Sequence, residues 1–75
     1  MTIGERIIQL RNENGITDKE LAERLCFVAS QGMSRYLVRL RKWEREELKP
    51  MYKMLPRIAE AFNMTLSQLF EGVDR

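Results

Sequence analysis

The segment from Ser34 to Trp43, S-R-Y-L-V-R-L-R-K-W, combines cations with an apolar stripe in a spacing that suits contact with DNA. At about 100° per residue, a helix over this segment separates the two kinds of side chain. The apolar side holds Met33, Tyr36, Leu37, Leu40 and Trp43. The opposite side holds Arg35, Val38, Lys42 and Arg45, with Arg39 and Arg41 on its flanks. In a major groove, cationic groups can reach phosphates and guanine edges, and a short apolar side chain can contact a thymine methyl.

The same pattern is also typical of an ordinary surface helix with a solvated polar face. A net charge of +2 is too small to indicate a nucleic-acid partner by itself. Its distribution says more, because residues 35–53 hold seven cations and three acids, a balance of +4, whereas the rest of the chain holds six cations and eight acids, a balance of −2. Positive potential is therefore concentrated around the segment, which favours DNA as a partner.

The composition argues against several other classes of function. The chain has no histidine and a single cysteine, Cys26, so we expect no metal site and no histidine-based catalysis. It shows neither a glycine-rich phosphate loop nor paired carboxylates in an evident cleft, which predicts no enzyme, no cofactor and no small-molecule ligand. No apolar run approaches the ~20 residues of a membrane span, and nothing resembles a signal peptide, so we expect a cytoplasmic protein without a membrane partner.

Capping motifs and apolar spacing predict an all-α domain of 75 residues with five short helices. The predicted helices cover about 3–13, 18–26, 34–46, 52–62 and 66–71. Capping-box spacing begins three of them, at Thr2, Thr17 and Thr65, and Ser34 is the predicted cap of the central helix. Gly15 is a natural left-handed stop after the first helix.

Two stretches leave the helix boundaries open. Cys26, Phe27 and Val28 could extend the second helix, whereas Ser30-Gln31-Gly32 indicates a break. Pro56 is tolerated only in the first turn of a helix, so the fourth helix could start near Leu55, with residues 51–54 forming a separate tight turn.

The order of these motifs resembles the phage repressor/Cro-type (XRE-type) helix-turn-helix family. The likeness covers nearly the whole chain and rests on I-G-E-R-I-I-Q-L-R-N-E-N-G-I-T-D-K-E-L-A-E-R-L, then W-E-R, then a proline followed by I-A-E-A-F-N-M-T-L-S-Q-L-F. The resemblance implies one compact five-helix DNA-binding domain whose second and third helices form the helix-turn-helix. It also implies a transcription regulator that usually acts as a dimer on a palindromic operator.

Three departures from the family pattern concern the DNA-facing side. Leu25 and Trp43 are eighteen positions apart, a longer connection between the second and third helices than the family usually has, although the related POU-specific domains also have a lengthened one and bind DNA. Asp18 stands where the family usually offers a glutamine to a phosphate. Leu37 and Val38 stand where it usually carries polar side chains that read bases.

These considerations assign expected roles to the candidate site residues. Lys42 matches a base-contacting position of the family and also faces outward on the helical wheel. The base-facing set is Arg35, Val38 and Lys42. The phosphate-facing set is Thr17, Lys19, Arg39, Arg41, Arg45 and Lys49. The apolar residues Leu69, Phe70 and Val73 near the end of the chain could form a dimer interface, although closing the monomer core explains the first two nearly as well.

Two functions remain in competition at this point. The first is a sequence-specific regulator, most simply a repressor, that binds double-stranded DNA as a homodimer and places its third helix in the major groove. The second is a helix-turn-helix module that contacts another protein, as an antitoxin or antirepressor-like partner would. The lengthened connection, Asp18 and the Glu46-Glu47 pair favour the second function, and the +4 balance over residues 35–53 favours the first.

Overall fold

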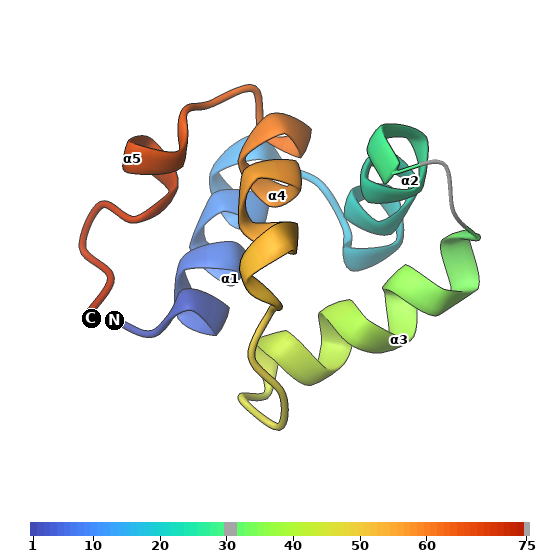
Figure 1. Cartoon of the computed structure of the whole chain (residues 1–75), viewed down its shortest axis with the longest axis horizontal. Helices are drawn as coiled ribbons and strands as arrows, with labels where there is room; N and C mark the ends of the chain where they lie inside the picture. Colours follow the sequence, from blue (N-terminus) through green and yellow to red (C-terminus); the bar gives the residue numbers. More distant parts are fainter. Residues whose placement is uncertain (30–31, 75) are drawn as a thin grey trace.

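The computed structural model describes residues 1–29 and 32–74, which form five α-helices and one short 3-10 helix (Figure 1). In chain order these are α1 (Ile3–Asn14), α2 (Asp18–Ala29), α3 (Met33–Glu44), the 3-10 turn η1 (Tyr52–Met54), α4 (Leu55–Ala61) and α5 (Leu66–Leu69). The described part of the chain contains no β-strand, and the predicted all-α fold is confirmed. Within that same part, no helix is long and apolar enough to cross a membrane.

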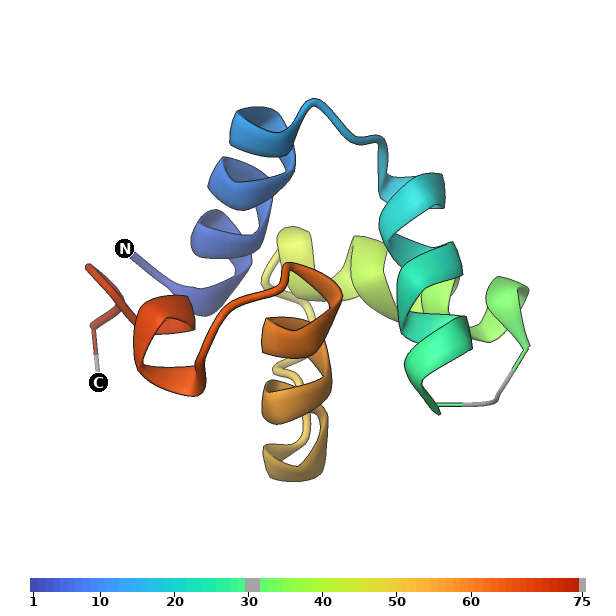
Figure 2. The ribbon, with the colours of Figure 1, turned by 90° about the horizontal axis from the view of Figure 1, so that it is seen from above.

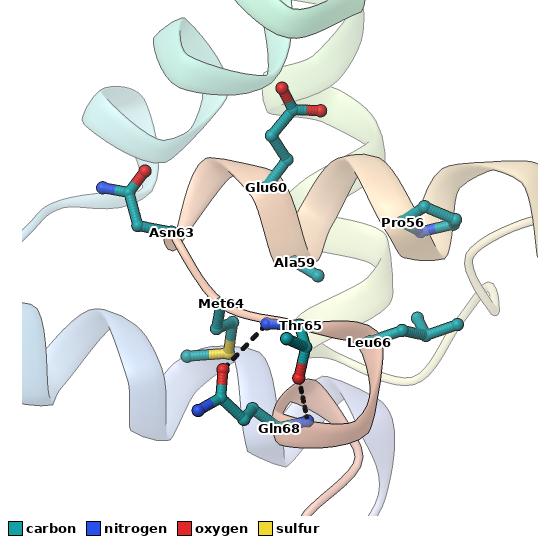
Figure 3. Close-up of a pocket in the computed structure, with 8 residues that line it drawn as sticks. All are labelled: Pro56, Ala59, Glu60, Asn63, Met64, Thr65, Leu66 and Gln68. Carbon is teal, nitrogen blue, oxygen red and sulfur yellow. Dashed lines mark hydrogen bonds between the residues drawn. The ribbon is translucent and has the colours of Figure 1, made fainter.

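Three threonines start helices as their spacing predicts. The Oγ1 atom of Thr2 accepts the backbone N–H of Glu5 at 3.2 Å, and Thr65 accepts that of Gln68 at 3.2 Å (Figure 3). Thr17 starts α2 in the same way. In each case the glutamate or glutamine side chain accepts the threonine N–H in return. These reciprocal bonds satisfy donors that a helix start leaves open, so local sequence alone fixes three helix starts.

The boundaries around the central helix differ from the prediction. α2 continues to Ala29, three residues beyond the predicted end. α3 begins one residue early, at Met33, with Gly32 as a cap that has no side-chain bond, so Ser34 as the cap was wrong. The helix ends at Glu44 rather than near residue 46, because Glu46 adopts a left-handed backbone with φ of 60°. Of the predicted break, Ser30 and Gln31 lie outside the described residues.

The C-terminal third follows the alternative that Pro56 suggested. A separate turn, η1, precedes α4, and α4 starts at Leu55 with the proline in its first turn. The helix ends at Ala61, and Asn63 follows it with φ of 55°. α5 ends at Leu69, two residues before the predicted end. The left-handed turn at Asn63 reverses the chain so that α5 can pack beside α1.

The core lies between α1, α2 and α4, with α3 running across one side of it (Figure 2). Eight large side chains are fully buried there: Ile7, Leu10, Leu21, Leu25, Tyr36, Leu40, Ile58 and Leu69. Ala22 and Ala59 are buried as well, which lets the helices that carry them approach closely. The consequence for α3 is that α1 and α2 both pack against its buried face.

Gly4 marks the closest approach of α1 to α3. A Cβ atom built on Gly4 would collide with the backbone carbonyl oxygen of Trp43. The indole of Trp43 is itself 98% hidden from solvent. Since a backbone carbonyl cannot swing aside as a flexible side chain can, only a glycine allows the two helices to meet at this distance.

Arg6 joins the last helix to the first. Its side chain is buried, and its Nε donates to the carbonyl oxygen of Leu69 at 3.0 Å while Nη2 donates to that of Gln68 at 2.7 Å. A third donor, Nη1, bonds Oε1 of Gln9 at 2.9 Å. The guanidinium therefore satisfies carbonyls that a four-residue helix cannot bond internally.

The two ends of the described chain also meet. The ammonium group of Met1 donates to the carbonyl oxygen of Gly72 at 2.9 Å and to Oδ2 of Asp74 at 3.0 Å. The N–H of Asp74 donates back to the carbonyl oxygen of Met1 at 2.8 Å. Both ends lie beside the start of α1, on the opposite side of the molecule from the first turn of α3 (Figure 1).

Candidate nucleic-acid interface

The burial of α3 confirms the apolar side of the helical wheel drawn for the central segment, apart from Met33, whose side chain lies outside the described part of the structure. Tyr36 and Leu40 are fully buried and Trp43 nearly so, while Leu37 is half-buried. The opposite face is exposed, and it carries the cations. Burial of one apolar stripe fixes the rotation of the helix about its axis, so the orientation of the cationic face follows from the core.

The predicted base-facing residues share that exposed face. Arg35, Val38 and Lys42 follow one another at spacings of three and four residues, which places them along one side of the helix, and all three are exposed. The valine side chain is 54% exposed although the core lies directly beneath the helix. Because α3 begins at Met33, Arg35 is in its first turn, the part of a recognition helix that reaches base edges.

The predicted phosphate-facing residues lie in three places. Thr17 and Lys19 stand at the start of α2, where both are exposed, and the hydroxyl oxygen of Thr17 already accepts a helix N–H. Arg39 and Arg41 flank the exposed face of α3. Arg45 and Lys49 lie in the link that follows α3.

Some cations of this region form an ion pair with an acid, and others do not. Arg45 forms an exposed ion pair with Glu47, with 2.9 Å between Nε and Oε2. Lys42 and Lys49, like Arg39, form no ion pair with any of the described residues. An exposed pair such as that of Arg45 contributes little to stability, so it presents only a small barrier to a competing phosphate.

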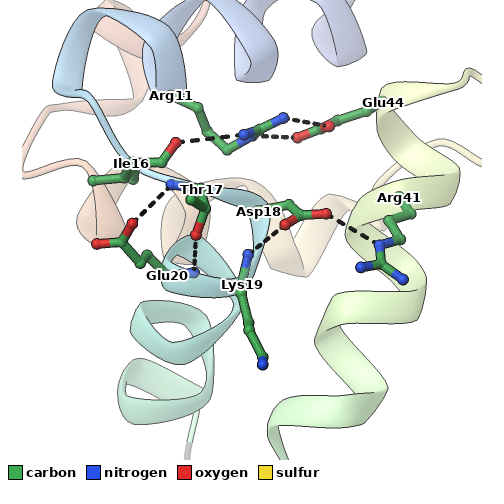
Figure 4. A network of polar contacts seen from close by, with 8 residues as sticks. All are labelled: Arg11, Ile16, Thr17, Asp18, Lys19, Glu20, Arg41 and Glu44. Atoms are coloured by element: carbon green, nitrogen blue, oxygen red, sulfur yellow. Dashed lines mark hydrogen bonds and ion pairs between the residues drawn. The ribbon is translucent and has the colours of Figure 1, made fainter.

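Asp18 links the start of α2 to the last turn of α3 (Figure 4). Its Oδ1 accepts the N–H of Lys19 at 2.7 Å, and its Oδ2 accepts Nε of Arg41 at 3.1 Å. The hydrogen bond from Arg41 is the largest reason that the pKa of the Asp18 carboxyl is lowered, and the N–H of Lys19 contributes in the same direction. The carboxylate is therefore charged at neutral pH, and Arg41 balances it.

A second pair, which the sequence prediction did not include, fixes the end of α3. Arg11 donates from Nε and Nη2 to the two carboxylate oxygens of Glu44, at 2.7 and 2.8 Å. The side chains are only 17% and 12% exposed, and the bond to Glu44 raises the pKa of Arg11. Nη1 reaches the carbonyl oxygen of Ile16 at 3.4 Å (Figure 4). One guanidinium thus joins α1, the α1–α2 turn and α3.

The residues predicted for a dimer interface differ in how deeply they are buried. Leu69 is fully buried in the core and offers no surface to a partner, whereas Phe70 and Val73 are half-buried. A larger apolar area, which we term the link patch, lies beside them. It consists of Leu48, Met51, Tyr52 and Leu66, which are 47, 65, 87 and 41% exposed.

Two hollows lie beside three of the four residues of the link patch. Leu48 lines one of them and Tyr52 and Leu66 line the other, and both hollows have Leu55 and Phe70 in their walls. A third hollow lies between α4 and the start of α5 (Figure 3). Exposed apolar area gathered in one place, rather than scattered singly, is typical of a contact surface.

Comparison with known proteins agrees with this geometry. A family model described as helix-turn-helix matches residues 7–69, from within α1 to the end of α5. The match therefore includes the exposed face of α3 and the start of α2. No curated protein matches the chain.

Proposed function

Because the chain belongs to the phage repressor/Cro-type helix-turn-helix family of DNA-binding transcription regulators, we propose that it is a sequence-specific repressor that reads the major groove with α3. The 12 residues of α3 form a helix about 18 Å long. The major groove of DNA is about 12 Å wide, and this width admits an α-helix. Repression then follows from occupying promoter DNA.

The exposed face of α3 is the observation that carries this proposal. Val38 stands open to solvent between the cations Arg35 and Lys42, where a water-facing helix gains nothing from an apolar side chain. In a groove the same arrangement matches two kinds of target, since the cations suit guanine and phosphate oxygens and the valine suits a thymine methyl. Thr17 and Lys19 at the start of α2 then lie where a phosphate can meet a helix N-terminus and a cation.

Selection of bound duplexes from random-sequence DNA, read at two salt concentrations, tests the proposal. The wild type is expected to enrich one motif and to show a steep negative slope of log affinity against log salt. Lys42→Ala is expected to weaken binding to that motif by about 1–3 kcal/mol and to relax the preference at one base pair. Lys53→Ala is the matched control, because Lys53 is an exposed lysine outside α3, and we expect its affinity to stay within about twofold of wild type.

Absence of any enriched motif would sink the repressor proposal. The search would then move to the alternative function, a protein partner for the same fold. If a motif is enriched and Lys42→Ala binds it as well as the wild type does, the regulator proposal stands. Lys42 would then not be one of the residues that contact bases.

We further propose that two copies associate through the link patch, with Phe70 and Val73 at its edge. Most of the patch follows the end of α3 in the chain, and a dimer formed through it would have to place its two copies of α3 about one DNA turn, ~34 Å, apart to bind adjacent half-sites. This arrangement suits a palindromic operator.

Substitution of the most exposed member of the patch tests the dimer. Tyr52→Asp is expected to halve the molecular mass in solution and to abolish the preference for two half-sites over one, because a carboxylate would be buried in the contact. Phe27→Asp is the control: Phe27 is 88% exposed, Tyr52 is 87% exposed, and the phenylalanine lies outside the patch, on α2. Equal masses for wild type and Tyr52→Asp would contradict this interface.

A further inference from the structure

An acid stands at the start of α2, on the side proposed to face DNA. Asp18 is the first residue of α2, and its carboxylate is held from two sides, by its neighbour's N–H and by Nε of Arg41. The residues are 23 positions apart in the chain, so the bond crosses from α2 to α3. The aspartate side chain is 31% exposed and that of the arginine is 55% exposed.

The hydrogen bond to Asp18 leaves the two terminal amino groups of Arg41 available for a ligand. A guanidinium carries five N–H donors in a planar fork, and the aspartate takes the one on Nε. The four N–H groups on Nη1 and Nη2 donate to no acceptor within the described part of the chain. These are the groups that bind a phosphate in a bidentate manner.

An arginine that is already hydrogen-bonded to an acid loses less conformational freedom on binding a phosphate than an unbonded arginine does. A long cationic side chain normally samples many rotamers, and it loses that freedom when it contacts a phosphate. Here the hydrogen bond from Nε to Asp18 already restricts the orientation of the guanidinium in the free protein. The cost of the arrangement is a carboxylate near the DNA, but its charge is paired at short range and partly screened by solvent.

We propose that Asp18 is a positioning residue for DNA binding, which holds Arg41 so that its two terminal amino groups meet a backbone phosphate. The inference rests on the proposed function. It reverses the simple expectation for an acid at this place, which is that it repels DNA. Asp18 itself contacts no phosphate and acts through Arg41.

A double-mutant cycle measured on the selected operator tests the inference. Asp18→Ala is expected to weaken binding about three- to tenfold although it removes a negative charge, and Arg41→Ala to weaken it about tenfold. In the Arg41→Ala background, Asp18→Ala is expected to cause no further weakening. Glu23→Ala removes an exposed acid from the same helix without touching Arg41, and we expect no weakening from it.

The salt dependence separates positioning from a loss of structure. A lost phosphate contact reduces the slope of log affinity against log salt by about 0.9. We expect that reduction for Arg41→Ala and a part of it for Asp18→Ala. A variant that is merely less folded would lower the fraction of active protein and leave the slope unchanged, and thermal unfolding of each variant identifies that case.

The outcomes distinguish this inference from the function on which it rests. If the wild type binds its motif and Asp18→Ala binds equally well or more tightly, with or without Arg41, the aspartate only repels DNA and the inference is wrong. An unchanged salt slope in Asp18→Ala overturns it as well. If the wild type enriches no motif, the proposed function fails and the positioning role fails with it.

Discussion

Gly4→Ala is expected to lower the free energy of unfolding by about 3 kcal/mol. The new Cβ meets the carbonyl oxygen of Trp43, so α1 and α3 must separate or the backbone must bend. A gain of about 1 kcal/mol in helix propensity is too small to offset this. For a domain of this size the loss corresponds to a fall of about 12–24 °C in the midpoint of thermal unfolding.

Gly32→Ala provides the control for Gly4→Ala. Apart from its chain neighbours, no atom of the described residues lies within 4 Å of a Cβ built at Gly32, and its φ of −62° suits any residue. We expect a change in unfolding free energy within about 1 kcal/mol, because a small loss at the helix cap is offset by reduced freedom of the unfolded chain. A Gly4→Ala variant as stable as this control would contradict the prediction. It would show that α1 and α3 can move apart without a loss of unfolding free energy.

Arg11→Met is expected to cost about 2–3 kcal/mol of unfolding free energy, the second large effect. The substitution leaves the Glu44 carboxylate 88% hidden from solvent without its partner, which is more harmful than the loss of the pair itself. Chemical denaturation of the single and double variants measures both contributions.

The double variant Arg11→Met, Glu44→Leu supplies the matched comparison. Replacing both partners with apolar side chains of similar size is often neutral, so we expect it to recover most of the stability that Arg11→Met loses. A double variant as unstable as the single one would mean that the pair acts by fixing geometry rather than by balancing charge. The bond from Arg11 to the carbonyl oxygen of Ile16 would then be the part to examine.

Local sequence predicted the parts of the fold that local bonds determine. The capping boxes at Thr2, Thr17 and Thr65 each involve residues three apart, so the pattern can be read directly. The apolar face of α3 follows in the same way from its period. Ser34 misled the prediction because a serine at a helix start is a general signal, and Gly32 caps α3 without any side-chain bond.

Contacts between distant residues could not be predicted in this way. Arg6 and Leu69 are 63 positions apart, and Arg11 and Glu44 are 33 apart, so only the packed helices show that each pair meets. Asp18 was interpreted from its type alone, as an acid unsuited to DNA. Its bond to Arg41 changes the chemistry of both side chains, and a helical wheel of either helix cannot display it.

The pairing of Met1 with Gly72 and Asp74 has a practical consequence for how the protein is tethered. A dye, tag or surface linker at either end would emerge from a single point on the molecule. Thr2, Val73 and Asp74 line the same hollow as Leu48, so that point adjoins the link patch, while the first turn of α3 lies at the far side (Figure 1). A protein immobilised through Met1 would keep α3 accessible but crowd the surface proposed for a second copy, and we therefore expect it to report affinity for a half-site.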